Sequence, residues 1–103
     1  MKKPFVLTPR AEQDIGDIWD YIAADSIDAA DRVLTALEKS IYRLAKTPGC
    51  GHLREDLADG RHRFLLIYSY LIVYRFETRP LQVIRVLHAS RDVRSILGLT
   101  TEE

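Results

Sequence analysis

"VIRVLHASRD", Val83 to Asp92, begins with the pattern of a strand and ends in a polar cluster. The apolar and β-branched residues at its start predict a strand. The stretch also holds His88, Ser90, two arginines and an aspartate. Three interpretations follow: a catalytic site, a docking surface, or a strand end with a hydrogen-bonded histidine. The rest of the chain is needed to choose between them.

Two more β-rich runs precede this one, "RHRFLLI" (residues 61–67) and "YLIVYRF" (residues 70–76), and a turn is expected around Tyr68 and Ser69. The third strand is expected over "LQVIRVLH", residues 81–88. Successive side chains of a strand point to opposite faces, and these strands are apolar on both. One layer of helices covers only one face. The other is covered either by the end of the chain and its loops or by a partner protein.

The first half of the chain predicts a helical hairpin. Thr8 and Pro9 are typical of a helix start, and apolar residues then recur every three or four positions up to Ile22. Asp25 or Ser26 caps a second helix, which "TPGCG" (residues 47–51) ends. Ser90 is expected to cap a short last helix, and residues 100–103 are expected to fray.

These elements predict one α+β domain over residues 1–103, with an N-terminal helical hairpin packed on a small, mainly antiparallel sheet. The expected order is strand, helix, helix and three strands, with a short C-terminal helix. A short strand at "PFVL" (residues 4–7) opens the chain.

Composition limits the class of protein. The longest apolar run, residues 64–74, has 11 residues, too few to span a bilayer, so a cytoplasmic protein without a membrane partner is expected. Cys50 is the one cysteine, which allows no disulfide within the chain. Net charge is zero, but residues 1–60 hold 8 basic and 11 acidic residues, whereas residues 61–103 hold 7 arginines and 4 acids. The arginines fit either an acidic partner or ordinary pairing across the sheet.

Catalytic and metal chemistry have limited support. The three histidines and Cys50 lack the spacing of a metal site, so neither metal nor cofactor is expected. The one enzymatic option is acid–base cleavage of RNA, with His88 as base or acid and Arg61, Arg63 and Arg91 as phosphate-binding groups. Strict strand alternation places Arg85 on the face opposite His88. A histidine beside aliphatic residues is also typical of a half-buried structural side chain.

Taken together, four segments resemble the ParE toxins of the RelE/ParE superfamily of bacterial toxin–antitoxin systems. They are "LTPRAEQDIGDIWDYIA" (residues 7–23), "RLAKTPGCGHLREDL" (residues 43–57), "YLIVYR" (residues 70–75) and "VIRVLHASRD". The resemblance implies the fold described above. It also implies a toxin that a ParD-like antitoxin neutralises by folding a disordered segment across it.

The resemblance implies one of two targets. ParE-type members poison DNA gyrase, whereas RelE-type members cut mRNA on the ribosome with a cluster of basic and acidic residues and a tyrosine near the C-terminal end. Here Ala89 follows His88, no tyrosine follows Tyr74 and no lysine follows Lys46. These departures favour a gyrase-directed toxin without catalytic residues of its own. A ribosome-dependent endoribonuclease is the alternative, and a degenerate toxin that only binds its antitoxin is a third possibility.

The sequence therefore predicts docking residues rather than catalytic ones, and no direct sequence-specific contact with nucleic acid. An acidic, amphipathic antitoxin segment is expected along both helices and the arginine-bearing sheet. The predicted partner-binding residues are Arg61, Arg63, Arg75, Arg85, Arg91, Trp19, Leu37 and Ile41.

Overall fold

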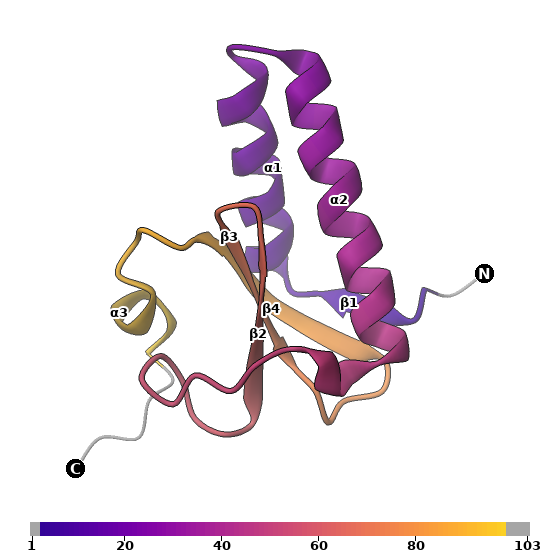
Figure 1. The fold of residues 1–103 in the computed structure, drawn as a ribbon, viewed down its shortest axis with the longest axis vertical. Coiled ribbons are helices and arrows are strands. Elements are labelled where there is room, and N and C mark those ends of the chain that lie inside the picture. Colours follow the sequence, from indigo (N-terminus) through magenta and orange to yellow (C-terminus); the bar gives the residue numbers. More distant parts are fainter. Residues whose placement is uncertain (1–2, 99–103) are drawn as a thin grey trace.

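The computed structural model describes residues 3–98 and confirms the predicted α+β architecture (Figure 1). The expected fraying of residues 100–103 lies outside the described residues. The elements follow one another as β1 (Phe5–Leu7), α1 (Pro9–Ala23), α2 (Ile27–Lys46), the short 3-10 helix η1 (Pro48–Cys50), β2 (His62–Ile67), β3 (Tyr70–Arg75), β4 (Leu81–His88) and α3 (Val93–Leu97). Within residues 3–98 no helix is both long and apolar enough to cross a membrane.

The four strands form one sheet in the order β1-β4-β3-β2. β4 lies between β1, to which it is parallel, and β3, to which it is antiparallel; β2 is an antiparallel edge strand. The predicted turn at Tyr68 and Ser69 is confirmed, because Ile67 pairs with Tyr70. Tyr68 has a φ of 54°, a left-handed conformation that is uncommon outside glycine.

Each helix of the hairpin begins at a capping side chain. The Thr8 hydroxyl accepts a hydrogen bond from the Ala11 N–H at 3.1 Å, and Pro9 occupies the first helical position. Of the two candidates for the second cap, Ser26 is the one used: its hydroxyl accepts from the Ala29 N–H at 3.1 Å. Thr8 also donates to the Ile84 carbonyl at 2.7 Å, which fixes the start of α1 to β4.

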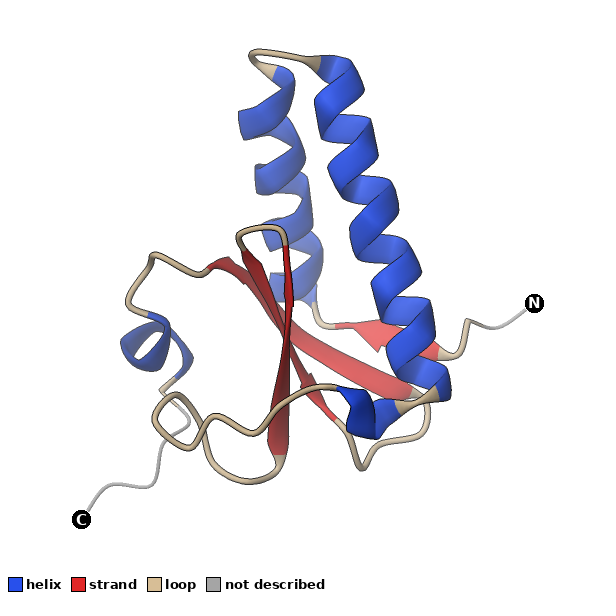
Figure 2. Ribbon diagram, in the orientation of Figure 1, coloured by secondary structure: helices blue, strands red, loops and turns tan. Residues whose placement is uncertain are grey.

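The two faces of the sheet are covered by different parts of the chain (Figure 2). The hairpin packs on one face through a core that includes Leu37, Ile41 and Leu44. The 51–60 segment and α3 cover the other, where Ala58 and Val93 pack with Phe64 and its neighbours. The sequence left open whether the chain or a partner covers this second face. In the structure the chain itself covers most of it. Figure 1 also shows the hairpin extending beyond the end of the sheet.

A buried tyrosine fixes the loop that leaves α2. The Tyr74 hydroxyl donates to the Pro48 carbonyl and accepts from the Gly51 N–H at 3.0 Å. Burial raises the pKa of this hydroxyl. Gly51 packs so closely that a Cβ at this position would overlap the Tyr74 hydroxyl. The loop after α2 is thereby held against the centre of the sheet.

Candidate functional site

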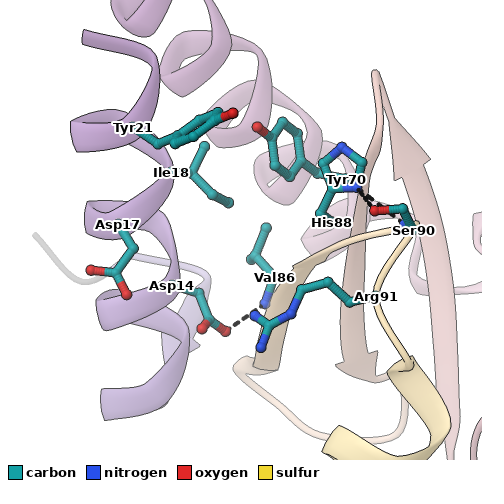
Figure 3. Close-up of a pocket in the computed structure, with 9 residues that line it drawn as sticks. All are labelled: Asp14, Asp17, Ile18, Tyr21, Tyr70, Val86, His88, Ser90 and Arg91. Atoms are coloured by element: carbon teal, nitrogen blue, oxygen red, sulfur yellow. Dashed lines mark hydrogen bonds between the residues drawn. The ribbon is translucent and has the colours of Figure 1, made fainter. Parts of the chain in front are cut away.

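A hollow of about 500 Å³ opens between α1 and the C-terminal end of β4 (Figure 3). Helix α1 contributes one wall, and Tyr70 of β3, Val86 of β4 and the turn after β4 contribute the other. The rings of Tyr21 and Tyr70 lie across the hollow from one another in Figure 3. We call this hollow the α1–β4 pocket. Its lining residues are Asp14, Asp17, Ile18, Tyr21, Tyr70, Val86, His88, Ser90 and Arg91.

Asp14, which lines the pocket, forms an ion pair with Arg85 of β4. Arg85 donates to both oxygens of Asp14, through Nε at 2.7 Å and through an Nη at 3.0 Å. The Val86 N–H also donates to Asp14, at 3.0 Å. The hydrogen bond with Asp14 raises the pKa of Arg85 further, although burial opposes it. Only 12% of the Arg85 side chain and 10% of the Asp14 side chain are exposed, so the prediction of Arg85 as a docking residue is corrected: its charge is used within the fold.

A β-bulge interrupts β4 immediately before Arg85. Val73 pairs with Arg85 and Tyr74 pairs with Val83, so Ile84 is an extra residue in β4. Beyond the bulge, Arg85 pairs with Val73 of the second core and Val86 pairs with Ile72 of the first, while the Arg85 guanidinium and the Val86 N–H both reach Asp14. His88 pairs with Tyr70, which packs against the same core as Val86, so Arg85 and His88 leave β4 on opposite faces, as strand alternation predicts.

His88 is held by the serine two positions after it, Ser90. The Ser90 N–H donates to Nδ1 of His88 at 3.1 Å, and the Ser90 hydroxyl lies 2.7 Å from the same atom. A backbone N–H can only donate, so Nδ1 is the acceptor and the neutral ring carries its proton on Nε2. The Tyr70 ring meets the His88 ring edge-on, with centroids 5.4 Å apart. His88 thus offers the pocket a donor.

Ser90 does not cap the last helix, contrary to the prediction. Asp92 is the N-cap of α3, and its side chain accepts from the Ser95 N–H at 3.3 Å. Ser90 lies two positions earlier, and its hydroxyl contacts His88. Both residues are polar and precede an apolar run, so the sequence alone did not distinguish them.

The pocket assembles only part of the predicted nuclease set. His88 and Arg91 line the same hollow. Arg61 lies in the turn before β2 and pairs with Asp59 at 3.2 Å. Arg63 stacks on the Phe76 ring at 4.4 Å and donates to the Gly51 carbonyl. The two remote arginines therefore cannot hold a phosphate that lies in the α1–β4 pocket.

The remaining predicted docking residues occupy different environments. Leu37 and Ile41 are each 1% exposed, which corrects their prediction as partner contacts, because a partner cannot reach them while the fold is intact. The Trp19 indole N–H donates to Asp31 at 2.9 Å and so links the two helices. Arg75, at the end of β3, has a buried Nε without a hydrogen-bond partner, as does Arg63.

Among the lining residues that sequence reasoning did not assign to a site are two acids and two tyrosines. Asp14 stands three positions after Ala11 and four before Ile18, on the apolar stripe of α1, and an acid in that position signals a buried partner. Tyr21, 80% exposed, gave no comparable signal. Tyr70 and Asp17 belong to the site only through the tertiary fold. In residues 3–98 no cluster of three or more His, Cys, Asp or Glu side chains is placed to bind a metal ion.

Known proteins are similar to this chain in sequence or in fold. Toxin ParE1 of Caulobacter vibrioides is 35% identical over 97 residues, which cover 93% of this chain and 99% of that protein. Toxin ParE1 of Mycobacterium tuberculosis is 30% identical over 95 residues, covering 90% of this chain and 96% of that protein. A solved structure described as a chromosomal ParDE TA system from P. aeruginosa has the same fold, with a TM-score of 0.69 at 18% identity over 84% of this chain and 95% of that one.

The match extends to the family as a whole. Residues 5–93 fit the model of the "ParE toxin of type II toxin-antitoxin system, parDE". This range runs from β1 to the first residue of α3 and includes every residue that lines the α1–β4 pocket. The chain belongs to the ParE toxin family of type II toxin–antitoxin systems.

Proposed function

We propose that this toxin acts by binding DNA gyrase and trapping its cleaved complex with DNA, and that a ParD-like antitoxin neutralises it. Membership of the ParE family and the fold shared with a ParDE system support the proposal. Because its proposed target acts on the chromosome, the toxin works in the cytoplasm.

The observation that carries the proposal is the fixed orientation of His88. Its Nδ1 is occupied by Ser90, and the neutral ring therefore has no free nitrogen in the pocket to take a proton from a substrate. The pocket does offer donors, from Nε2 of His88 and from Arg91, beside the apolar surfaces of Ile18 and Tyr21. Such a mixture suits the binding of a protein side chain more than proton abstraction.

A gyrase assay with two arginine variants tests this. Arg91→Glu reverses the charge at the pocket, whereas Arg79→Glu reverses it in the turn between β3 and β4, at the opposite end of these strands. We expect wild type and Arg79→Glu to inhibit supercoiling and accumulate cleaved DNA, and Arg91→Glu to lose about ten-fold or more in potency. Equal potency of the two variants would exclude the pocket as the gyrase contact.

One observation favours the alternative of a ribosome-dependent endoribonuclease. No tyrosine follows Tyr74 in the sequence, but in space the Tyr70 ring contacts the His88 ring, and Arg91 lines the same pocket. An aromatic ring, a histidine and an arginine can together bind a nucleotide. This alternative predicts cut mRNA in the ribosomal A site and loss of cutting in folded His88→Ala.

A further inference from the structure

Strand β2 has an open edge at Leu66. It is the outermost strand of the sheet, beyond β3 (Figure 1). Phe64 uses its outward N–H and C=O on His52, with two hydrogen bonds of 2.8 Å. Backbone groups alternate in direction along a strand, so Leu65 and Ile67 bond to β3 while Leu66 directs its N–H and C=O outward. His52 does not extend far enough along β2 to cover Leu66.

An apolar groove lies beside this edge, on the face away from the hairpin. Its volume is about 390 Å³. Phe64, Leu66 and Leu71 form its apolar surface together with Leu57 and Val93, and Leu66 is 55% exposed. We call it the β2 groove. It is the part of the second face that the 51–60 segment and α3 leave open.

The charge around the β2 groove favours an acidic occupant. Its lining contains Arg54 and His52 but no acidic residue. Arg54 pairs with Asp56 at 2.9 Å, and the two side chains are 47% and 63% exposed. A pair this exposed contributes little to stability, so Arg54 can exchange Asp56 for a carboxylate of a partner.

We propose that the β2 groove binds an extended segment of the antitoxin, which adds a strand to the sheet at Leu66 and places an acidic side chain near Arg54. This inference rests on the proposed function. A strand edge selects an extended chain because only such a chain presents N–H and C=O groups in the matching direction. A second copy of the toxin fits poorly, since Arg54 and His52 would approach their own counterparts across a two-fold axis.

The position of the β2 groove also accounts for neutralisation. Ala89 lines the β2 groove, while its neighbours His88, Ser90 and Arg91 line the α1–β4 pocket. The turn after β4 therefore separates the two sites by the width of one chain. An antitoxin segment in the β2 groove lies against the back of the turn that carries Arg91, and the rest of that antitoxin can block the pocket.

A proline substitution isolates the backbone contribution. Leu66→Pro removes the outward N–H without removing a bond to β3, whereas Leu66→Ala removes the same apolar side chain and keeps the N–H. We expect the full-length ParD-like antitoxin encoded beside the toxin to bind Leu66→Pro about ten-fold more weakly than Leu66→Ala. Binding within two-fold of Leu66→Ala would overturn the inference, provided both variants unfold at similar temperatures.

Hydrogen exchange on the wild-type complex gives an answer that needs no variant. The Leu66 amide should exchange quickly in the free toxin and at least ten-fold more slowly with antitoxin bound. An unchanged rate in the complex would overturn the inference but leave the proposed function intact. Failure of the antitoxin to bind wild-type toxin at all would count against the proposed function itself. Protection that grows with toxin concentration, without antitoxin, would assign the edge to a second copy and overturn the inference.

Discussion

One buried carboxylate connects helix α1 to the central strand. Asp14 accepts three hydrogen bonds, two from Arg85 and one from the Val86 N–H. We predict that Asp14→Ala lowers the free energy of unfolding by about 2–4 kcal/mol, because it leaves a largely buried guanidinium without its partner. Asp17→Ala, an exposed acid of the same helix, is the control and should cost less than about 0.5 kcal/mol. Denaturant unfolding that shows equal small losses would contradict this role.

The close contact between Gly51 and Tyr74 leaves no room for a larger residue at position 51. Gly51→Ala should destabilise the fold by about 2–3 kcal/mol, since the added methyl group overlaps the buried Tyr74 hydroxyl. Gly49→Ala is the matched control, because a Cβ there meets nothing within 4 Å. Thermal unfolding of the two variants compares them directly. Equal melting temperatures would show that the loop shifts without cost.

Acid sensitivity follows from Asp59. Its hydrogen bond with the nearly buried His62, 2.9 Å long, lowers the pKa of Asp59 to about 2. A carboxyl whose pKa is lower in the folded state stabilises the fold above its unfolded pKa and loses that contribution as the pH falls toward 2. The free energy of unfolding of wild type should therefore exceed that of Asp59→Asn by about 1–2 kcal/mol near pH 6. This difference should shrink below about pH 4. A difference independent of pH would contradict the assignment.

Residue roles were the least predictable part of the sequence. Periodicity identified Leu37 and Ile41 as apolar positions of a helix but could not say whether the chain or a partner buries them. Asp14 was readable in principle, as an acid within an apolar stripe. The orientation of His88 depends on hydrogen bonds from Ser90, two positions away. From the sequence, Ser90 was equally suited to cap the last helix.

At the scale of elements, the caps decide where helices begin. Both Asp25 and Ser26 suit the start of α2, and the structure uses the Ser26 hydroxyl. We predict that Ser26→Ala lowers the free energy of unfolding by about 1 kcal/mol, whereas Asp25→Ala changes it by only a few tenths. The reverse order in denaturant unfolding would mean that α2 begins one residue earlier in solution.

Helices, strands and turns were predictable because their signals are local. Apolar spacing, capping residues and glycine–proline stops lie within a few positions of the boundary they set. The bulge in β4 was not predictable in this way. It depends on Tyr74 pairing with Val83 and on Thr8 and Asp14 accommodating the backbone around the extra residue Ile84. The contact of Arg85 with Asp14 was not predictable either, because it depends on where α1 lies against β4.

Across the whole molecule, target binding and antitoxin binding are proposed for two different surfaces, which the turn after β4 separates. The α1–β4 pocket is proposed for the target and the β2 groove for the antitoxin. We predict that Arg91→Glu loses gyrase poisoning but binds antitoxin within about three-fold of wild type, while Leu66→Pro keeps poisoning and escapes neutralisation. Growth arrest on expression, with and without antitoxin, measures both properties. Loss of both properties in each variant, with the fold intact, would show a single shared surface.

The overall architecture followed from the sequence, but the cover of the second sheet face did not. Two apolar faces and one hairpin left a choice between the chain and a partner. In the structure the 51–60 segment and α3 bury Phe64 and Val73, and Leu66 stays exposed. Loop placement is set by a few non-local contacts such as that of His52 with Phe64, which no periodicity reports.

A stoichiometric titration tests the central claim, that this toxin binds its target and performs no catalysis. Purified toxin is added in steps to fixed gyrase and DNA, and in parallel to ribosomes translating a labelled mRNA. We predict that cleaved gyrase–DNA complex rises with toxin and levels off once toxin matches the gyrase binding sites, that folded His88→Ala reaches the same plateau at a higher toxin concentration, and that the mRNA stays whole. Folded toxin that traps no gyrase in excess, yet cuts many mRNA molecules per toxin, would contradict the account.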